Sequence, residues 1–112
     1  MASIFSKIGS KEIPADLVYE DEVCFAFKDL APKAPTHLLI VPREEFASAN
    51  EVDEGREKLV GHLVRVAAQL ARERGLSQSG YRLVFNTGSN AGQTVFHLHL
   101  HLLGGRPLHE MG

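Results

Sequence analysis

The sequence contains a single cysteine and lacks any long apolar run. Cys24 lies in the apolar stretch 23–27, where it can form no internal disulfide and is expected to be a small buried residue. A lone thiol favours a reducing compartment, so we expect a cytoplasmic protein. No run of about 18 apolar residues is present, and residues 1–9 lack the apolar block of a signal peptide, so neither membrane spanning nor export is expected.

Positive charge is not in excess either. The chain has 12 Lys and Arg against 14 Asp and Glu, which does not fit a dedicated nucleic-acid binder. It has neither the Gly-x-x-x-x-Gly-Lys-Ser/Thr loop nor the Gly-rich dinucleotide fingerprint, so nucleotide binding of those two kinds is not indicated. With 112 residues the chain is long enough for one core and too short for two, and we expect a single domain over residues 1–112.

The apolar pattern predicts an α+β fold. A short helix is expected over residues 3–8, begun by Ser3, ended by Gly9 and lying over the sheet. Apolar or alternating runs bounded by turn residues predict strands at 17–20, 23–27, 36–41, 81–86 and 96–103. Together with one long helix, these elements predict a five-stranded, mostly antiparallel sheet with one long and one short helix.

The long helix is expected over residues 51–74, because apolar residues there recur at helical spacing. Asn50 and Asp53 are a candidate capping box, and Gly75 is a candidate left-handed stop. His62 lies within this helix, and we expect it to be solvated or packed rather than catalytic.

The most informative feature is the run from His97 to Leu103, in which His97, His99 and His101 alternate with leucines. Alternation is the period of a β-strand, so the three imidazoles are expected on one face and the leucines on the other. A merely structural strand would carry Thr, Lys, Glu or Ser on its polar face, since histidine has only middling β preference. The pattern therefore indicates chemistry on one face and packing on the other.

Metal binding is one chemistry open to these histidines, since neutral imidazole is the commonest zinc ligand. Along an extended strand, residues two apart are separated by roughly 7 Å and residues four apart by roughly 14 Å, so the outer pair cannot both reach one ion. A site would need two of the three with an outside ligand such as His37, and no acid or cysteine pattern completes it. We therefore expect no metal and no other cofactor.

A phosphate ester or anhydride suits the histidines better. Its reaction needs donors for the phosphate charge, a nucleophile and an acid for the leaving group, and histidine, with an ordinary pKa of about 6.5, can supply all three. His99 has another histidine two residues away on each side, and it is therefore the natural nucleophile. The loop before it supports this interpretation: Gly88 and Gly92 allow close backbone approach to a phosphate, and Gln93 and Thr94 add side-chain donors.

The residues from His97 to Leu103 match the histidine triad pattern, His-φ-His-φ-His-φ-φ with φ apolar. The match extends to four flanking segments, at 35–42, 86–89, 92–96 and 104–106. The chain thus resembles the histidine triad family in its Hint branch, the histidine triad nucleotide-binding proteins, over roughly residues 3–109.

This resemblance implies a purine nucleoside phosphoramidase that cleaves the P–N bond of adenosine 5'-phosphoramidates, including AMP joined to a lysine amine. It implies that His99 attacks the α-phosphorus and forms a nucleotidyl-histidine that water then hydrolyses. His101 would hold the phosphate oxygens and assist proton transfer. His97 would support His99, partly through its main-chain carbonyl, and His37 would complete the proton network.

The resemblance also implies a nucleotide-binding set. Asp29 and Leu30 match the positions that grip the ribose and base, Asn86 matches a phosphate-side contact, and Thr94 stands where many members have serine. The full set is Asp29, Leu30, Asn86, Gly92, Gln93, Thr94, His99 and His101. The family forms two-fold homodimers that join two five-stranded sheets into one, and we expect the same here.

Two other functions stay open. Dinucleoside polyphosphate hydrolases of the Fhit type retain the triad, and the same fold could serve as a nucleotide-binding regulatory module whose turnover is incidental. Galactose-1-phosphate uridylyltransferases carry glutamine in the third position, so His101 argues for hydrolysis. The tail 108–112 lacks the tryptophan and prolines of many animal relatives. The resemblance implies that this tail shapes the leaving-group side of the pocket, so the leaving-group preference stays open.

Overall fold

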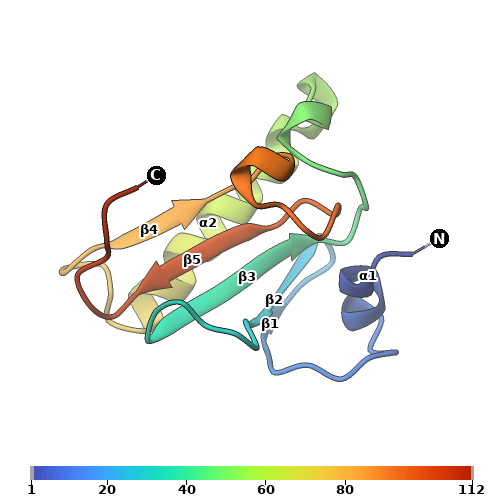
Figure 1. Ribbon diagram of the computed structural model, residues 1–112. Coiled ribbons are helices and arrows are strands. Elements are labelled where there is room, and N and C mark those ends of the chain that lie inside the picture. The colour runs from blue at the N-terminus through green and yellow to red at the C-terminus, as the bar shows by residue number, and fades with distance from the viewer. Residues whose placement is uncertain (1, 112) are drawn as a thin grey trace.

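The computed structural model describes residues 2–111, so the predicted domain limits at Met1 and Gly112 lie outside the described residues. The elements in chain order are α1 (Ile4–Gly9), β1 (Leu17–Glu20), β2 (Cys24–Lys28), β3 (Thr36–Pro42), the 3-10 turns η1 (Ala49–Glu51) and η2 (Glu54–Arg56), α2 (Glu57–Glu73), β4 (Tyr81–Val84), the 3-10 turn η3 (Ser89–Ala91) and β5 (Leu100–Gly104). The strands form one antiparallel sheet in the order β1-β2-β3-β5-β4 (Figure 1). The predicted α+β fold is confirmed.

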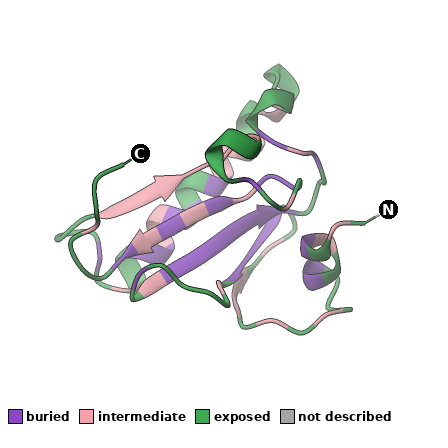
Figure 2. Ribbon diagram, viewed as in Figure 1, coloured by how far each residue is buried: buried purple, intermediate pink, exposed green. Residues whose placement is uncertain are grey.

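The two helices cover opposite faces of the sheet (Figure 1). Because neighbouring residues of a strand point to opposite sides, β3 supplies side chains to both faces and is buried along nearly its whole length, as Figure 2 shows. The core under α2 includes Leu38, Ile40, Leu63, Leu70, Leu100 and Leu102. The core under α1 comprises Phe5, Ile8, Phe25, Phe27, Leu39 and Val41.

The short helix α1 begins as predicted. The Ser3 hydroxyl is its N-cap and accepts the Ser6 N–H at 3.0 Å. Its last residue, Gly9, lies so close to β2 that a Cβ atom there would stand 2.5 Å from Cε1 of Phe25. The absence of a side chain at Gly9 therefore allows α1 to lie against the sheet.

The long helix α2 begins at Glu57, so the predicted start at Glu51 is wrong. The capping box is formed by Ser48 and Glu51, whose carboxylate accepts the Ser48 N–H at 3.2 Å. The predicted box of Asn50 and Asp53 does not form, since Asp53 makes no side-chain cap bond. The box therefore closes the turn η1 and not the long helix.

The stretch before α2 is held in tight turns by contacts that apolar spacing does not reveal. Arg56 donates to the Glu51 carbonyl at 2.8 Å and to the Glu44 carboxylate at 2.9 Å. At the other end, the helix finishes at Glu73 and Gly75 has φ +73°, the predicted left-handed stop.

The strand β5 begins at Leu100, later than predicted. Its partner β3 pairs Ile40 with Leu100, and the same register would place Pro42 opposite Leu98. Proline has no N–H to continue the ladder, and the Leu98 N–H instead donates to the Phe46 carbonyl at 2.8 Å. The first two histidines of the motif therefore lie before the strand.

The shorter β5 also shortens β4, which ends at Val84 and not at residue 86, because Val84 already pairs with His101 near the start of β5. The predicted alternation nevertheless holds, since Leu98, Leu100 and Leu102 all belong to the core under α2. Among the described residues, no helix combines the length and the apolar character that crossing a bilayer requires.

Candidate active site

Two histidines from neighbouring strands meet on the face of the sheet that α2 leaves free. His37 of β3 pairs with Leu103, and His101 of β5 pairs with Leu39, so the two histidines are diagonal neighbours. Their rings lie close together, with His37 Nε2 2.9 Å from His101 Nδ1. The Asp29 carboxylate, which follows β2, lies 3.4 Å from the same His37 nitrogen.

Hydrogen bonding determines which nitrogens of these rings carry protons. The Lys33 N–H donates to His37 Nδ1 at 3.0 Å, so the neutral His37 ring carries its hydrogen on Nε2. That N–H faces His101 Nδ1, which accepts, and leaves the hydrogen of His101 on Nε2. His101 Nε2 lies 3.5 Å from Nδ2 of Asn86, and because both atoms are then donors, the Asn86 amide would have to turn its oxygen toward His101 to accept from it. His101 therefore presents an N–H donor on the side of Asn86.

Burial keeps His37 and the three histidines of the motif uncharged. It lowers the pKa of His37, His97 and His99 below the ordinary 6.5. Burial, followed by the neighbouring His99 and His37, lowers the pKa of His101 to about 4. At neutral pH each ring therefore has one bare nitrogen and one N–H.

His99 has the arrangement of a nucleophile. Its Nδ1 lies 2.7 Å from the main-chain oxygen of His97, and because a carbonyl only accepts, Nδ1 carries the hydrogen. The lone pair of Nε2 is then free to attack. The ring stands at 5.0 Å from the His101 ring and meets Phe5 of α1 edge-on at 4.9 Å, both measured between centroids.

His97 is turned into the protein and is fully buried. Its Nε2 lies 2.8 Å from the Pro42 carbonyl, so this nitrogen carries the hydrogen. Its Nδ1 lies 2.5 Å from the Ser3 hydroxyl, which therefore donates to it. The imidazole of His97 thus bonds to the Pro42 carbonyl and to the Ser3 hydroxyl, while its main-chain oxygen contacts His99.

A cavity of about 740 Å³ opens beside His37 and His101, whereas His97 and His99 are not part of its lining. Five of the predicted site residues line it: Asp29, His37, Asn86, Gly92 and His101. Leu30, next to Asp29 in the chain, is 95% exposed, so its apolar side chain is available to a ligand. The cavity is large enough for a nucleotide-sized molecule.

The far side of the cavity is formed by the tail of the chain. Residues 108–111 line it, and Arg82 of β4 holds the tail by donating to the His109 carbonyl at 2.8 Å. Lys33 and Arg106 add two more cationic side chains to the lining. The predicted role of this tail in shaping one side of the pocket is consistent with this position.

The loop before the triad is braced by Gln93, which is buried. Its side-chain oxygen accepts the Gly88 N–H at 2.8 Å, and its amide nitrogen donates to the carbonyls of Ala47 and Val95 at 2.7 and 3.1 Å. Both amide hydrogens are therefore taken, so the predicted side-chain donation to a phosphate is not available in this arrangement. Thr94, in contrast, is exposed. As nucleotide-binding residues both stay predictions.

Two contacts of the triad were not predicted. The sequence identifies Ser3 only as a helix cap, and it places Phe5 only within the short helix expected over residues 3–8. Ser3 lies 94 positions from His97 in the sequence, and no local pattern indicates that α1 would lie against the triad. The sequence signal for both residues is limited to the helix that carries them.

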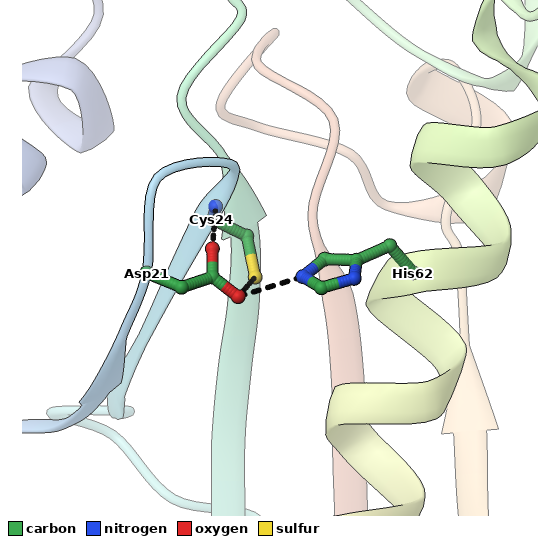
Figure 3. A group of neighbouring side chains, drawn as sticks. All are labelled: Asp21, Cys24 and His62. Carbon is green, nitrogen blue, oxygen red and sulfur yellow. Dashed lines mark hydrogen bonds and ion pairs between the residues drawn. The ribbon is translucent and has the colours of Figure 1, made fainter.

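A second cluster lies on the α2 side of the sheet, as Figure 3 shows. Asp21, in the turn between β1 and β2, accepts His62 Nε2–H and the Tyr19 hydroxyl, each at 2.7 Å, and also the Cys24 N–H at 2.7 Å. Burial alone would raise the pKa of the Asp21 carboxyl, but these hydrogen bonds hold it well below its ordinary value. His62, which was expected to be solvated or packed, is half-buried and bonded to Asp21.

The thiol of Cys24 is fully buried, as predicted, and burial together with Asp21 raises its pKa to about 12. It is therefore a protonated, inert packing residue at neutral pH.

Two groups place three ligand-type atoms within 4.8 Å of one another: Asp29, His37 and His101, and Asp21, Cys24 and His62. In the second group every Asp21 oxygen is already occupied by protein donors. In the first group the ligands belong to the cavity itself, and His97, buried at the Pro42 carbonyl, stands apart from them. The triad thus does not form a three-histidine metal site.

Comparisons with known proteins cover nearly the whole chain. A family model described as the HIT domain matches residues 10–108. A purine nucleoside phosphoramidase of Escherichia coli is 48% identical over 109 residues, which are 97% of this chain and 92% of that protein. A HIT family hydrolase from Legionella pneumophila is 49% identical with a TM-score of 0.93, and the match covers 95% of each chain. A histidine triad protein from Clostridium difficile is 41% identical with a TM-score of 0.95, over 100% of this chain and 97% of that one. The chain therefore belongs to the HIT family of histidine triad proteins.

Proposed function

We propose that this protein is a purine nucleoside phosphoramidase, which hydrolyses the P–N bond of adenosine 5'-phosphoramidates such as AMP joined to a lysine amine. The likeness to the Escherichia coli phosphoramidase over nearly the whole chain supports this reaction class. The observation that carries the proposal is the 2.7 Å bond from His99 Nδ1 to the His97 carbonyl, because it directs the lone pair of His99 Nε2 away from the main chain.

In the first step, His99 Nε2 attacks the α-phosphorus, and the P–N bond to the amine breaks as the new N–P bond forms. The attacking ring becomes positively charged, and the His97 carbonyl stabilises that charge through the Nδ1–H. A bound phosphate favours the protonated form of His101, which carries hydrogens on both nitrogens. Its Nδ1–H then donates to His37 Nε2, so His37 carries its own hydrogen on Nδ1 and gives up the bond from the Lys33 N–H. His101 gives its Nε2 proton to the leaving nitrogen. The products are the free amine and a nucleotidyl-His99.

In the second step, water attacks the same phosphorus and the N–P bond breaks, which returns the lone pair to His99. His101, now neutral, accepts the proton of the water and is restored for the next cycle. Through both steps His101 Nδ1–H donates to His37 Nε2, which holds the ring, and Asp29 lies beside that bond. AMP is the second product.

The nucleotide is proposed to bind along the cavity. Asp29 and Leu30 contact the ribose and base, and Asn86, Gly92, Gln93 and Thr94 contact the phosphate side. Both hydrogens of the Gln93 amide donate to carbonyls, of Ala47 and of Val95. A side-chain donation from Gln93 to the phosphate would therefore replace one of these two bonds. The exposed Leu30 and the cavity-lining Asp29 support the first part of this arrangement.

The working unit is proposed to be a cytoplasmic homodimer that acts without nucleic acid, membrane, metal or other cofactor. β4 is an edge strand of the sheet, and an edge strand offers unpaired backbone groups to a second copy. Val64 on α2 is 40% exposed, which supports apolar burial by a partner copy. The lone buried thiol supports a reducing compartment.

The test offers labelled AMP-lysine, adenosine 5'-phosphoramidate and diadenosine polyphosphates to the wild type and to His99→Ala. We expect the wild type to release AMP from the phosphoramidates and to carry an acid-labile nucleotidyl adduct, and His99→Ala to lose about 1,000-fold or more in rate. His62→Gln, which changes a histidine on the opposite face of the sheet, is the matched control. Equal rates for wild type and His99→Ala would contradict the mechanism, and faster cleavage of polyphosphates would favour the Fhit-type activity.

A further inference from the structure

The helix α1 contacts the triad at two places, and neither contact belongs to the chemistry described above. Ser3, its N-cap, bonds to the imidazole of His97. Phe5, two residues later, packs edge-on against the ring of His99 at 4.9 Å. A segment at the start of the chain thus touches both the nucleophile and the residue whose carbonyl orients it.

The bond between Ser3 and His97 has only one arrangement of hydrogens when His97 is neutral. Because His97 Nε2–H donates to the Pro42 carbonyl at 2.8 Å, Nδ1 is bare and needs a donor. The Ser3 hydroxyl, at 2.5 Å, supplies it. The same oxygen accepts the Ser6 N–H at 3.0 Å as the helix cap, so it is fixed from a second direction.

Ser6 does not replace Ser3 in this role. Its hydroxyl lies farther away, at 3.5 Å from His97 Nδ1, and donates to the Glu45 carboxylate at 2.8 Å. Glu45 also accepts the Ser3 N–H at 2.9 Å, which ties the start of α1 to the segment that follows β3. The hydroxyl of Ser3 is therefore the one committed to His97.

We propose that Ser3 is a positioning residue for the nucleophile: it holds the buried imidazole of His97, and the main chain of His97 in turn holds His99 in the tautomer and orientation that attack requires. This inference rests on the proposed function for its kinetic consequence only. Without the Ser3 hydroxyl, His97 Nδ1 is a buried acceptor with no donor, and the ring must shift or take a different tautomer. The 2.7 Å bond from His99 to the His97 carbonyl shifts with it.

The variants must separate this role from helix capping. Glycine is nearly as good an N-cap as serine, so Ser3→Gly removes the hydroxyl at little cost to α1. Ser3→Thr keeps the hydroxyl and should restore the bond. Ser6→Ala removes the neighbouring hydroxyl, and Ser10→Ala removes an exposed hydroxyl at the other end of the same helix, where it bonds to Glu12.

The kinetic test measures kcat and KM for AMP-lysine in all four variants. We expect Ser3→Gly to lower kcat between about 10-fold and about 100-fold with KM nearly unchanged, because a displaced nucleophile affects the attack more than ground-state binding. Ser3→Thr should recover most of the loss, and Ser10→Ala and Ser6→Ala should stay within about threefold of the wild type. Equal losses in Ser3→Gly and Ser6→Ala, or wild-type kcat in Ser3→Gly, would overturn the proposal.

A second measurement needs no substrate. Nitrogen-15 chemical shifts of the imidazole rings report which nitrogen carries the hydrogen, and in the folded wild type we expect Nε2–H for His97 and Nδ1–H for His99. In Ser3→Gly the His97 signals should change and the His99 signals should broaden or move, while Ser10→Ala leaves both as they are. If the wild type hydrolysed no phosphoramidate, the proposed function would fail and these spectra would still decide the role of Ser3. Unchanged His97 and His99 spectra in a folded Ser3→Gly protein would refute it.

Discussion

His37 Nε2 faces His101 Nδ1 at 2.9 Å, although the two residues are 64 positions apart in the sequence. The Lys33 N–H determines the tautomer of His37, and His37 in turn determines that of His101. The orientation of the N–H at His101 Nε2 is thus set by a chain of bonds that begins at a main-chain amide.

Removing the imidazole of His37 should weaken catalysis by freeing the ring of His101. We expect His37→Ala to lower kcat for AMP-lysine by about 100-fold, the size of effect that a positioned proton donor contributes. His37→Gln, whose amide can place an N–H near the position of Nε2, should lose less. Steady-state kinetics of the two variants check this, and an equal loss in both would show that the donor is not what His37 contributes.

The buried histidines make stability depend on pH. Because burial lowers the pKa of His101 from 6.5 to about 4, the unfolded chain binds more protons than the folded one between these values. The free energy of unfolding should therefore be level above about pH 6.5 and fall as the pH drops toward about 4. Urea denaturation at a series of pH values measures the slope, and His101→Gln should flatten it. A slope that His101→Gln leaves unchanged would assign the loss to other groups.

Chelation should leave turnover unchanged, since the proposed steps use only imidazole nitrogens and water. The measurement compares AMP release from AMP-lysine before and after dialysis against a chelator. Asp29, His37 and His101 lie within 4.8 Å of one another and are the site at which an ion would act. Loss of activity on chelation, followed by recovery with Zn²⁺, would contradict the expectation and point to these three residues.

Replacing Gly9 or Gly61 by alanine should change the free energy of unfolding in opposite directions. At Gly9, the new Cβ would stand 2.5 Å from Phe25, so Gly9→Ala should destabilise the protein by about 1–3 kcal/mol. At Gly61, within α2, a Cβ meets nothing within 4 Å, and Gly61→Ala should stabilise it by about 0.5–1 kcal/mol. Urea unfolding of both variants checks the pair. Destabilisation by Gly61→Ala would show that this position is covered by something outside the chain, such as a partner copy.

Local pattern was sufficient to predict much of the fold. β1 was predicted with its observed limits, β3 was predicted as a strand buried on both faces, and Ser3 was predicted as the start of α1. The alternation of leucines after His97 correctly separated the packed face from the other one. These features depend on residues close in sequence, which is why spacing alone could reveal them.

The errors arise where distant segments decide the outcome. α2 starts late because Arg56 bonds to Glu44 and to the Glu51 carbonyl, and apolar spacing carries no information about those bonds. β5 starts late because of a proline on its partner strand, whose register was not known from sequence. The bond from Ser3 to His97 joins two ends of the chain, and only the packing of α1 on the sheet brings them together.

The early end of the pairing between β3 and β5 affects how such a site could be built. In a fully paired strand, the main-chain oxygens accept hydrogen bonds from the N–H groups of neighbouring strands. The His97 oxygen instead lies before β5 and accepts from the side chain of His99. A designer who copied the three alternating histidines onto an uninterrupted strand would reproduce their spacing without this acceptor. To transplant the nucleophile, the design would also have to include a place where the sheet stops, which Pro42 provides here.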